Sequence, residues 1–144
     1  MKPLFFSLLL FVTMSMNAFA ADTAVSPDIL KSFKKTFSTA KDVTWSTSND
    51  LYKADFVYRS QYITAYYDAE GNMLALTKNI LSTELPLLLG TSLREHYSNH
   101  WISEVLEVST EDGSRYYVTL ENADEKVVLK SVQNNWSVAK KVKK

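Results

Sequence analysis

Two histidines are the first residues whose spacing could support chemistry. His96 and His100 are the chain's full complement of histidine and stand four positions apart. On one continuous helix this spacing points both imidazoles to the same side, where Glu95 or Glu104 would supply a third metal ligand. Asn99 lies between the histidines and is a typical helix terminator, which would spoil that geometry. We therefore expect His96 on a solvent-facing helix position, His100 beyond the helix end, and no metal site.

A second group of oxygen-bearing side chains surrounds a glycine. Asp68, Glu70 and Asn72 flank Gly71, and carboxylate and amide oxygens are calcium ligands. A calcium loop of the EF-hand type needs twelve residues and a terminal bidentate glutamate, and this segment has neither. A glycine-containing hairpin turn that opens at Asp68 explains the segment more simply.

The residue types that enzymes need are sparse. The 144-residue chain has no cysteine and three glycines, so it holds no thiol nucleophile and no glycine-rich phosphate loop. No serine lies in a nucleophile-elbow pattern, and the carboxylates are scattered without a convincing pair. The formal net charge is +0, which gives no electrostatic footprint for nucleic acid. The sequence thus favours a non-enzymatic protein without a cofactor.

The first twenty residues predict export. Lys2 precedes an apolar run over 4–14, and Ala18, Phe19 and Ala20 form the small-x-small pattern of a cleavage site after Ala20. The run is well short of the ~20 residues that span a bilayer. A lipoprotein would need a cysteine at the cleavage point. We expect a mature chain that is periplasmic or secreted, without a membrane span or disulfides.

Two amphipathic helices are expected. Ser26 and Pro27 mark the first turn of one helix as N-cap and first residue. Its apolar positions recur at helical spacing: Ile29, Leu30, Phe33 and Phe37. The second apolar stripe consists of Leu85, Leu88, Leu89, Leu93 and Tyr97. Pro86 and Gly90 within it predict a broken first turn or two short helices.

Between and after these helices the period of the pattern changes to two. Four alternating segments follow the first helix: "VTWS", "YKADFVY", "YITAYYD" and "NMLALTK". Four more follow the second: "WISEVLEVST", "RYYVTLEN", "KVVLKSV" and "WSVAKKV". Short alternating strands joined by tight turns predict an antiparallel meander with one solvated face.

The halves run in the same order, which indicates an internal duplication. Leu93 lies 60 positions after Phe33, and Tyr116 lies 64 positions after Tyr52. We predict an α+β fold: a single domain over 21–144 built of two tandem helix-plus-meander repeats, about 26–80 and 81–144. A sheet with one apolar face needs a helix to cover it. The helices should therefore pack on one face of a curved antiparallel sheet.

The motifs "VTW" at 43–45, "AYYDAEG" at 65–71 and "LP" at 85–86 carry a resemblance. Across nearly the whole mature chain the sequence resembles secreted bacterial proteins with PepSY-like repeats, often described as β-lactamase-inhibitor-like (BLIP-like). The resemblance implies a non-enzymatic periplasmic or secreted domain. β-Lactamase inhibitor protein itself uses the open face of such a sheet to grip an enzyme. The classical inhibitor has disulfides, which this chain lacks.

Alternation assigns the strand residues to two faces, because consecutive strand residues point to opposite sides. Tyr67 should pack under a helix, whereas Tyr66 should look outward. The expected core joins the helical residues Ile29, Phe33, Phe37, Leu89 and Leu93 to Val43, Trp45, Ala54, Phe56, Ile63, Tyr67, Val118 and Leu120. The expected outward residues are Lys53, Asp55, Val57, Tyr62, Thr64 and Tyr66, then Tyr117, Thr119, Glu121, Val128 and Lys130.

The outward face is the candidate binding surface. Tyrosine buries a large area and keeps a polar group, so it is typical of protein-binding surfaces. The predicted site is Lys53, Asp55, Tyr62, Thr64, Tyr66, Tyr117, Thr119 and Lys130, and its expected partner is an envelope or secreted protein. Cross-strand aromatic and threonine pairs that merely stabilise a solvated sheet explain the same residues. A periplasmic module or envelope sensor that binds a small ligand, peptide or glycan remains the alternative.

Overall fold

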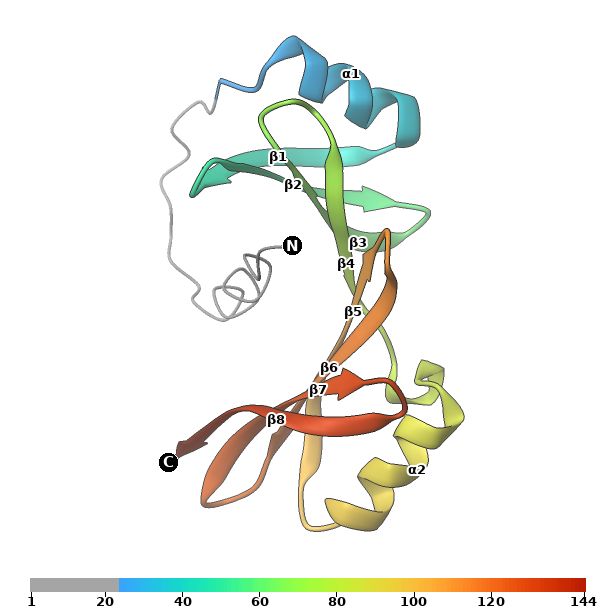
Figure 1. Ribbon diagram of the computed structural model, residues 1–144, viewed down its shortest axis with the longest axis vertical. Helices are drawn as coiled ribbons and strands as arrows, with labels where there is room; N and C mark the ends of the chain where they lie inside the picture. Colours follow the sequence, from blue (N-terminus) through green and yellow to red (C-terminus); the bar gives the residue numbers. More distant parts are fainter. Residues whose placement is uncertain (1–23) are drawn as a thin grey trace.

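The structure is a computed structural model that describes residues 24–144, so the predicted signal peptide lies outside the described residues. Eight strands form one antiparallel sheet in sequential order, β1 to β8 (Figure 1). Among the described residues, one α-helix precedes β1 and a second lies between β4 and β5. No helix in this part of the chain is long and apolar enough to cross a membrane. The elements are α1 (Pro27–Thr36), β1 (Lys41–Ser48), β2 (Leu51–Tyr58), β3 (Gln61–Tyr67), β4 (Met73–Asn79), the 3₁₀ helix η3 (Ser82–Glu84), α2 (Leu87–His96), β5 (Trp101–Thr110), β6 (Gly113–Glu121), β7 (Glu125–Val132) and β8 (Asn135–Lys143).

The start of α1 follows from its sequence. The Ser26 hydroxyl accepts a hydrogen bond from the Ile29 N–H at 3.4 Å, and Pro27 occupies the first turn. These residues satisfy one free N–H group and preset the backbone for a helix. Ile29 and Phe33 are buried, and the Phe37 N–H donates to the Phe33 carbonyl where the helix ends. The expected helix is confirmed.

The second helix is preceded by a separate 3₁₀ turn. Pro86 stands at its N-cap, but Gly90 lies within α2 and does not interrupt it. Leu89 and Leu93 are buried, one helical turn apart. Leu88 was expected in the apolar stripe, and that prediction is wrong because its side chain is 60% exposed. Successive helix residues are separated by about 100° around the axis, so Leu88 cannot share the face of Leu89.

Both helices cover the same face of the sheet. Ala65 lies opposite Leu76, and Leu76 lies opposite Ser109, so one row of side chains crosses from β3 to β5. Ala65 packs under α1, while Val105, four residues before Ser109 on the same side of β5, packs under α2. The helices lie near opposite ends of the long axis, and the ends of the sheet bend away from them (Figure 1). The helix-free face is therefore concave.

The core beneath α1 is aromatic. The Phe33 ring meets the Phe56 ring edge-on, with centroids 4.9 Å apart, and Phe37 contacts Phe56 with centroids at 4.7 Å. Trp45 packs against this core from β1. Val43 was expected there and is instead exposed, so that prediction is wrong. The β1–β2 ladder is irregular between Lys41 and Thr44, where β1 has one extra residue. Such an irregularity interrupts the regular alternation of side chains, so Val43 does not face the core.

The core beneath α2 is mainly aliphatic. Leu93 packs with Val105, Val118 and Leu120 in one cluster that continues onto β7. The Trp136 indole N–H donates to the Leu89 carbonyl at 3.0 Å, which connects β8 to the helix. The strand alternation thus correctly placed Val118 and Leu120 in the core.

Candidate binding surface

The helix-free face carries a small apolar cluster at its centre, which we call the central cluster. Tyr66, Ala75 and Val108 are its buried members, and the half-buried Leu106 and Tyr117 pack against them. These residues come from β3, β4, β5 and β6 in turn. The cluster therefore spans the junction between the first four strands and the last four, and it joins residues that the sequence left in separate halves.

Tyr66 is buried, which corrects the expectation of an outward tyrosine. Alternation placed it on the helix-free face correctly, but the central cluster leaves only 6% of it exposed. Burial raises the pKa of its hydroxyl, and the nearby Asp55 charge raises it further, while a hydrogen bond with Thr77 opposes both. Tyr66 is therefore a neutral residue that packs the centre of this face.

Tyr67 points to the opposite face, as predicted. It is fully buried against Phe56 and its neighbours under α1. Its hydroxyl has no hydrogen-bond partner among the described residues. Burial raises the pKa of the Tyr67 hydroxyl to about 12. The two adjacent tyrosines thus differ in face and in hydrogen bonding.

On β2 and β3 the predicted site residues form a polar group beside the central cluster. The Lys53 ammonium lies 3.0 Å from Asp55 Oδ2, and the Thr64 hydroxyl donates to Asp55 Oδ1 at 2.6 Å. The side chains of Lys53 and Asp55 are 40% and 44% exposed, so water weakens this ion pair. Tyr62 is 83% exposed, and of the predicted tyrosines it is the one that presents its ring to solvent.

On β6 and β7 the predicted residues differ in accessibility. Tyr117 and Lys130 lie opposite each other and are half-buried. Thr119 is 5% exposed, so its assignment to an accessible site is wrong. It lies between Glu104 on β5 and Val128 on β7, whose side chains flank it on the same face. A surface partner would reach Tyr117 and Lys130 before Thr119.

The sequence interpretation missed the residues that connect these two groups. Ala75 and Thr77 on β4, and Leu106 and Val108 on β5, lie on the helix-free face between them. The available signal was the segment "VLEV" in β5, in which Val105 and Leu106 are apolar on consecutive positions. Such a strand buries both faces.

The two histidines do not lie on one continuous helix. α2 ends at His96, and His100 lies beyond it, as expected. The His100 Nε2 atom lies 3.3 Å from Glu125 Oε1 and 3.1 Å from the Asn122 amide nitrogen. A hydrogen bond from Lys141 is the main cause that lowers the pKa of Glu125. Within residues 24–144 no group of three metal-ligating side chains comes together.

The turn between β3 and β4 is held by Asp68. Its Oδ1 atom accepts hydrogen bonds from the Glu70 N–H at 3.1 Å and the Asn72 N–H at 2.8 Å. Its Oδ2 atom accepts from the Asn72 side chain at 2.9 Å. Partial burial raises the pKa of Asp68, but these hydrogen bonds outweigh it and lower the pKa below 3.8. The carboxylate serves the turn, consistent with the hairpin interpretation.

Comparison with solved structures identifies the class of fold. A BLIP-like protein from Bacteroides fragilis is 22% identical, with a TM-score of 0.69 over 83% of this chain and 86% of that one. A DUF2874 family protein from Bacteroides uniformis is 18% identical, with a TM-score of 0.73 over 83% and 90%. A Bacteroides eggerthii protein proposed to be periplasmic is 15% identical, with a TM-score of 0.72 over 88% and 90%.

The chain therefore has the α+β fold of the BLIP-like and DUF2874 proteins, as the sequence resemblance indicated. The PepSY part of that resemblance is not confirmed, since none of these three proteins carries that name. No protein-family model matches the sequence, and no curated protein matches it.

Proposed function

We propose that this chain is a non-enzymatic binding module of the bacterial periplasm, and that it recognises a protein partner through the helix-free face of its sheet. The predicted signal peptide and the location proposed for the Bacteroides eggerthii structure support the compartment. The BLIP-like fold supports a module without catalytic machinery. The two helices, each followed by four strands, also support tandem repeats as the origin of the broad concave face.

One observation carries the choice of this face. A concave sheet surface, free of helices among the described residues, combines an apolar centre with an exposed aromatic ring and polar groups around them (Figure 1). The centre is the central cluster, the ring is Tyr62, and Lys53 and Asp55 belong to the polar surround. Protein interfaces have this arrangement of apolar core and polar rim, and tyrosine is enriched where single residues dominate binding.

The test uses two tyrosines and a matched control. The variant Tyr62→Ala, Tyr117→Ala removes the exposed ring and the half-buried ring of the face but leaves Tyr66 in place, because truncation of a fully buried tyrosine would confuse stability with binding. Leu87→Ala is the control, since Leu87 is 78% exposed on α2. Periplasmic proteins captured by each immobilised variant are quantified by mass spectrometry.

The proposal expects one or more partners that the unmodified chain and Leu87→Ala capture equally and that the double variant loses at least about tenfold. Tyr117 packs against the central cluster, so the double variant should melt at a lower temperature, and capture is measured well below that temperature. Tyr62→Ala alone, which removes an 83% exposed residue, should change melting little. Equal capture by all three proteins would remove these tyrosines from the interface and refute this use of the face.

A second candidate function is small-ligand binding, which a pocket beneath α2 favours. A pocket with an apolar floor and polar rim supports a small ligand, whereas the broad sheet face supports a protein partner. The two sites lie on opposite faces of the sheet and can be tested separately.

A further inference from the structure

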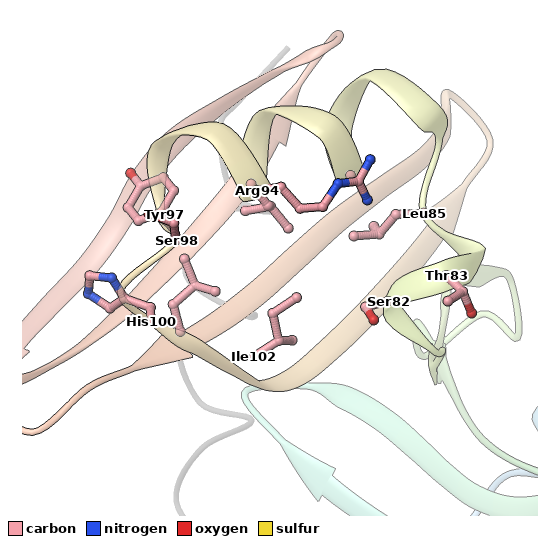
Figure 2. Close-up of a pocket in the computed structure, with 11 residues that line it drawn as sticks. Ser82, Thr83, Leu85, Arg94, Tyr97, Ser98, His100 and Ile102 are labelled. Atoms are coloured by element: carbon pink, nitrogen blue, oxygen red, sulfur yellow. The ribbon is translucent and has the colours of Figure 1, made fainter.

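A pocket of about 380 Å³ opens between α2, η3 and the start of β5 (Figure 2). Its floor is apolar and consists of the buried Leu85, Leu93 and Leu120, with the partly exposed Ile102 beside them. Its rim is polar. Small-molecule sites typically have volumes of about 300–1,000 Å³, apolar walls and a few convergent polar groups, so this pocket falls at the small end of that range.

At two of the positions that line this pocket, α2 has smaller residues than α1. Leu93 is the seventh residue of α2, and Phe33 is the seventh residue of α1. Gly90 is the fourth residue of α2, where α1 has Leu30. Under α1, Phe33 and the rings around it fill the space between helix and sheet. Under α2, Leu93 takes the place of the Phe33 ring, and Leu93 and Gly90 both line the pocket.

One exposed cation lies at the rim of the pocket. The Arg94 side chain runs along α2 toward the η3 end, where Ser82 and Thr83 also line the rim (Figure 2). Arg94 donates a hydrogen bond to the Thr91 hydroxyl at 3.2 Å, and within residues 24–144 no carboxylate forms an ion pair with it. The Glu84 carboxylate of η3 accepts from the Leu81 N–H at 2.7 Å. The guanidinium therefore retains donors for an incoming anion.

The opposite end of the pocket does not suit an anion. His100 lies there with Tyr97, and the His100 Nε2 atom is already within 3.3 Å of Glu125. The Asn122 amide nitrogen lies 3.1 Å from the same atom, and His100 Nδ1 lies 2.7 Å from Asn99 Oδ1, so both ring nitrogens already have partners. An anionic group would thus lie at the Arg94 end, with the rest of the ligand along the apolar floor toward Tyr97.

We propose that this pocket binds a small amphiphilic monocarboxylate, whose carboxylate pairs with Arg94 and the hydroxyls of Ser82 and Thr83 while its apolar tail covers Leu85, Leu93 and Ile102. Guanidinium groups match carboxylates geometrically, and such hydrogen bonds are stronger than neutral ones. The site is independent of the helix-free face, so failure of either proposal leaves the other untouched.

Straight-chain carboxylates are suitable probes. Hexanoate, octanoate and decanoate are titrated into the ¹⁵N-labelled chain below their micellar concentrations, and amide shifts are followed by NMR. Each added CH₂ pair should tighten binding about tenfold or more while the tail still finds apolar floor. The shifts should map to α2, η3 and the start of β5. Octan-1-ol, which lacks the charge, should bind about tenfold more weakly than octanoate.

Two variants and a control decide the result. Arg94→Gln should weaken octanoate binding about tenfold, whereas Arg59→Gln, the same charge change in the β2–β3 turn, should have no effect. Gly90→Leu should weaken binding, because a side chain at this lining position would occupy space at the Arg94 end of the pocket. A Cβ atom at Gly90 would lie 3.8 Å from Arg94 Nη1, which is an ordinary contact, and a melting measurement checks that the variant is folded. No binding by any probe, shifts elsewhere on the chain, or equal affinities for the two arginine variants would overturn the proposal.

Discussion

The adjacent tyrosines of β3 should respond oppositely to the same substitution. Tyr67→Phe removes a fully buried hydroxyl that has no hydrogen-bond partner among the described residues. A buried polar group without a partner costs about 1–3 kcal/mol. We therefore expect Tyr67→Phe to raise the free energy of unfolding by about 1 kcal/mol.

Tyr66→Phe removes a hydroxyl that hydrogen-bonds with Thr77. Thr77 is 5% exposed, so the substitution leaves its hydroxyl buried and short of a partner. Loss of the hydrogen bond costs about 0.5–1.5 kcal/mol, and the unpaired group adds to this. We expect Tyr66→Phe to lower the free energy of unfolding by about 1–2 kcal/mol.

Urea unfolding followed by tryptophan fluorescence measures both effects, because the Trp45 ring lies 6.0 Å from the Tyr67 ring. Each variant is the control for the other, since both delete one oxygen from one residue type on the same strand. Destabilisation by both variants, of similar size, would refute the reasoning and show that the Tyr67 hydroxyl makes a favourable interaction.

The raised pKa of Tyr67 also predicts how stability changes at alkaline pH. The pKa of Tyr67 rises from its ordinary value of 10.0 to about 12 in the folded chain. Between these values the unfolded chain releases a proton that the folded chain keeps, so stability falls as pH rises. Two pKa units correspond to roughly 2–3 kcal/mol. Tyr67→Phe should remove most of this loss between pH 10 and pH 12, and an unchanged slope would contradict the raised pKa.

Three further predictions concern the turn and the core. Gly71→Ala should destabilise the chain by about 1–3 kcal/mol in thermal melts, because φ is +87° and the new Cβ would lie 3.2 Å from the Asp28 carbonyl; a change under about 0.5 kcal/mol would contradict this. Asp68 has a lowered pKa, so its contribution to the free energy of unfolding is present above pH ~4 and disappears on acidification. Asp68→Ala should therefore make the free energy of unfolding, measured with urea, depend less on pH between pH 3 and 6. An unchanged pH dependence would contradict this prediction. Val118→Ala should lower the free energy of unfolding by about 2–3 kcal/mol, because Val118 is fully buried. Val138→Ala should lower it by less than about 0.5 kcal/mol, because Val138 is 56% exposed. Equal losses would show that the buried and exposed faces are misassigned.

The elements were predictable because their signals are local. Two helices and eight strands follow from periodicity over short windows, and both hairpin glycines, Gly71 and Gly113, lie at positive φ where turns require them. The errors within elements arose where one residue changes which side chains face the core. The ladder irregularity near Val43 changes the direction of the β1 side chains, and the start of α2 after Pro86 determines which leucines face the sheet. Neither boundary is visible in alternation alone.

The candidate surface was harder to predict, because accessibility depends on residues distant in sequence. Alternation gives the face of Tyr66 and Thr119 correctly. Their burial depends on side chains from neighbouring strands, such as Val108 on β5 and Val128 on β7. The pairing of β4 with β5 brings the two halves together, and no local pattern specified it. Tyr62 is not a member of the central cluster, and it is the most exposed of the predicted tyrosines.

Strand β5 explains why the two proposed sites can be separated. Leu106 and Val108 face the central cluster, whereas Ile102 and Val105 face the core and pocket beneath α2. Because side chains alternate along a strand, a substitution at one of these positions changes one surface and spares the other. A Tyr117 variant that loses partner capture but still binds octanoate would therefore locate the effect on the helix-free face. An Arg94→Gln variant that loses octanoate binding but still captures the partner would locate the effect in the pocket.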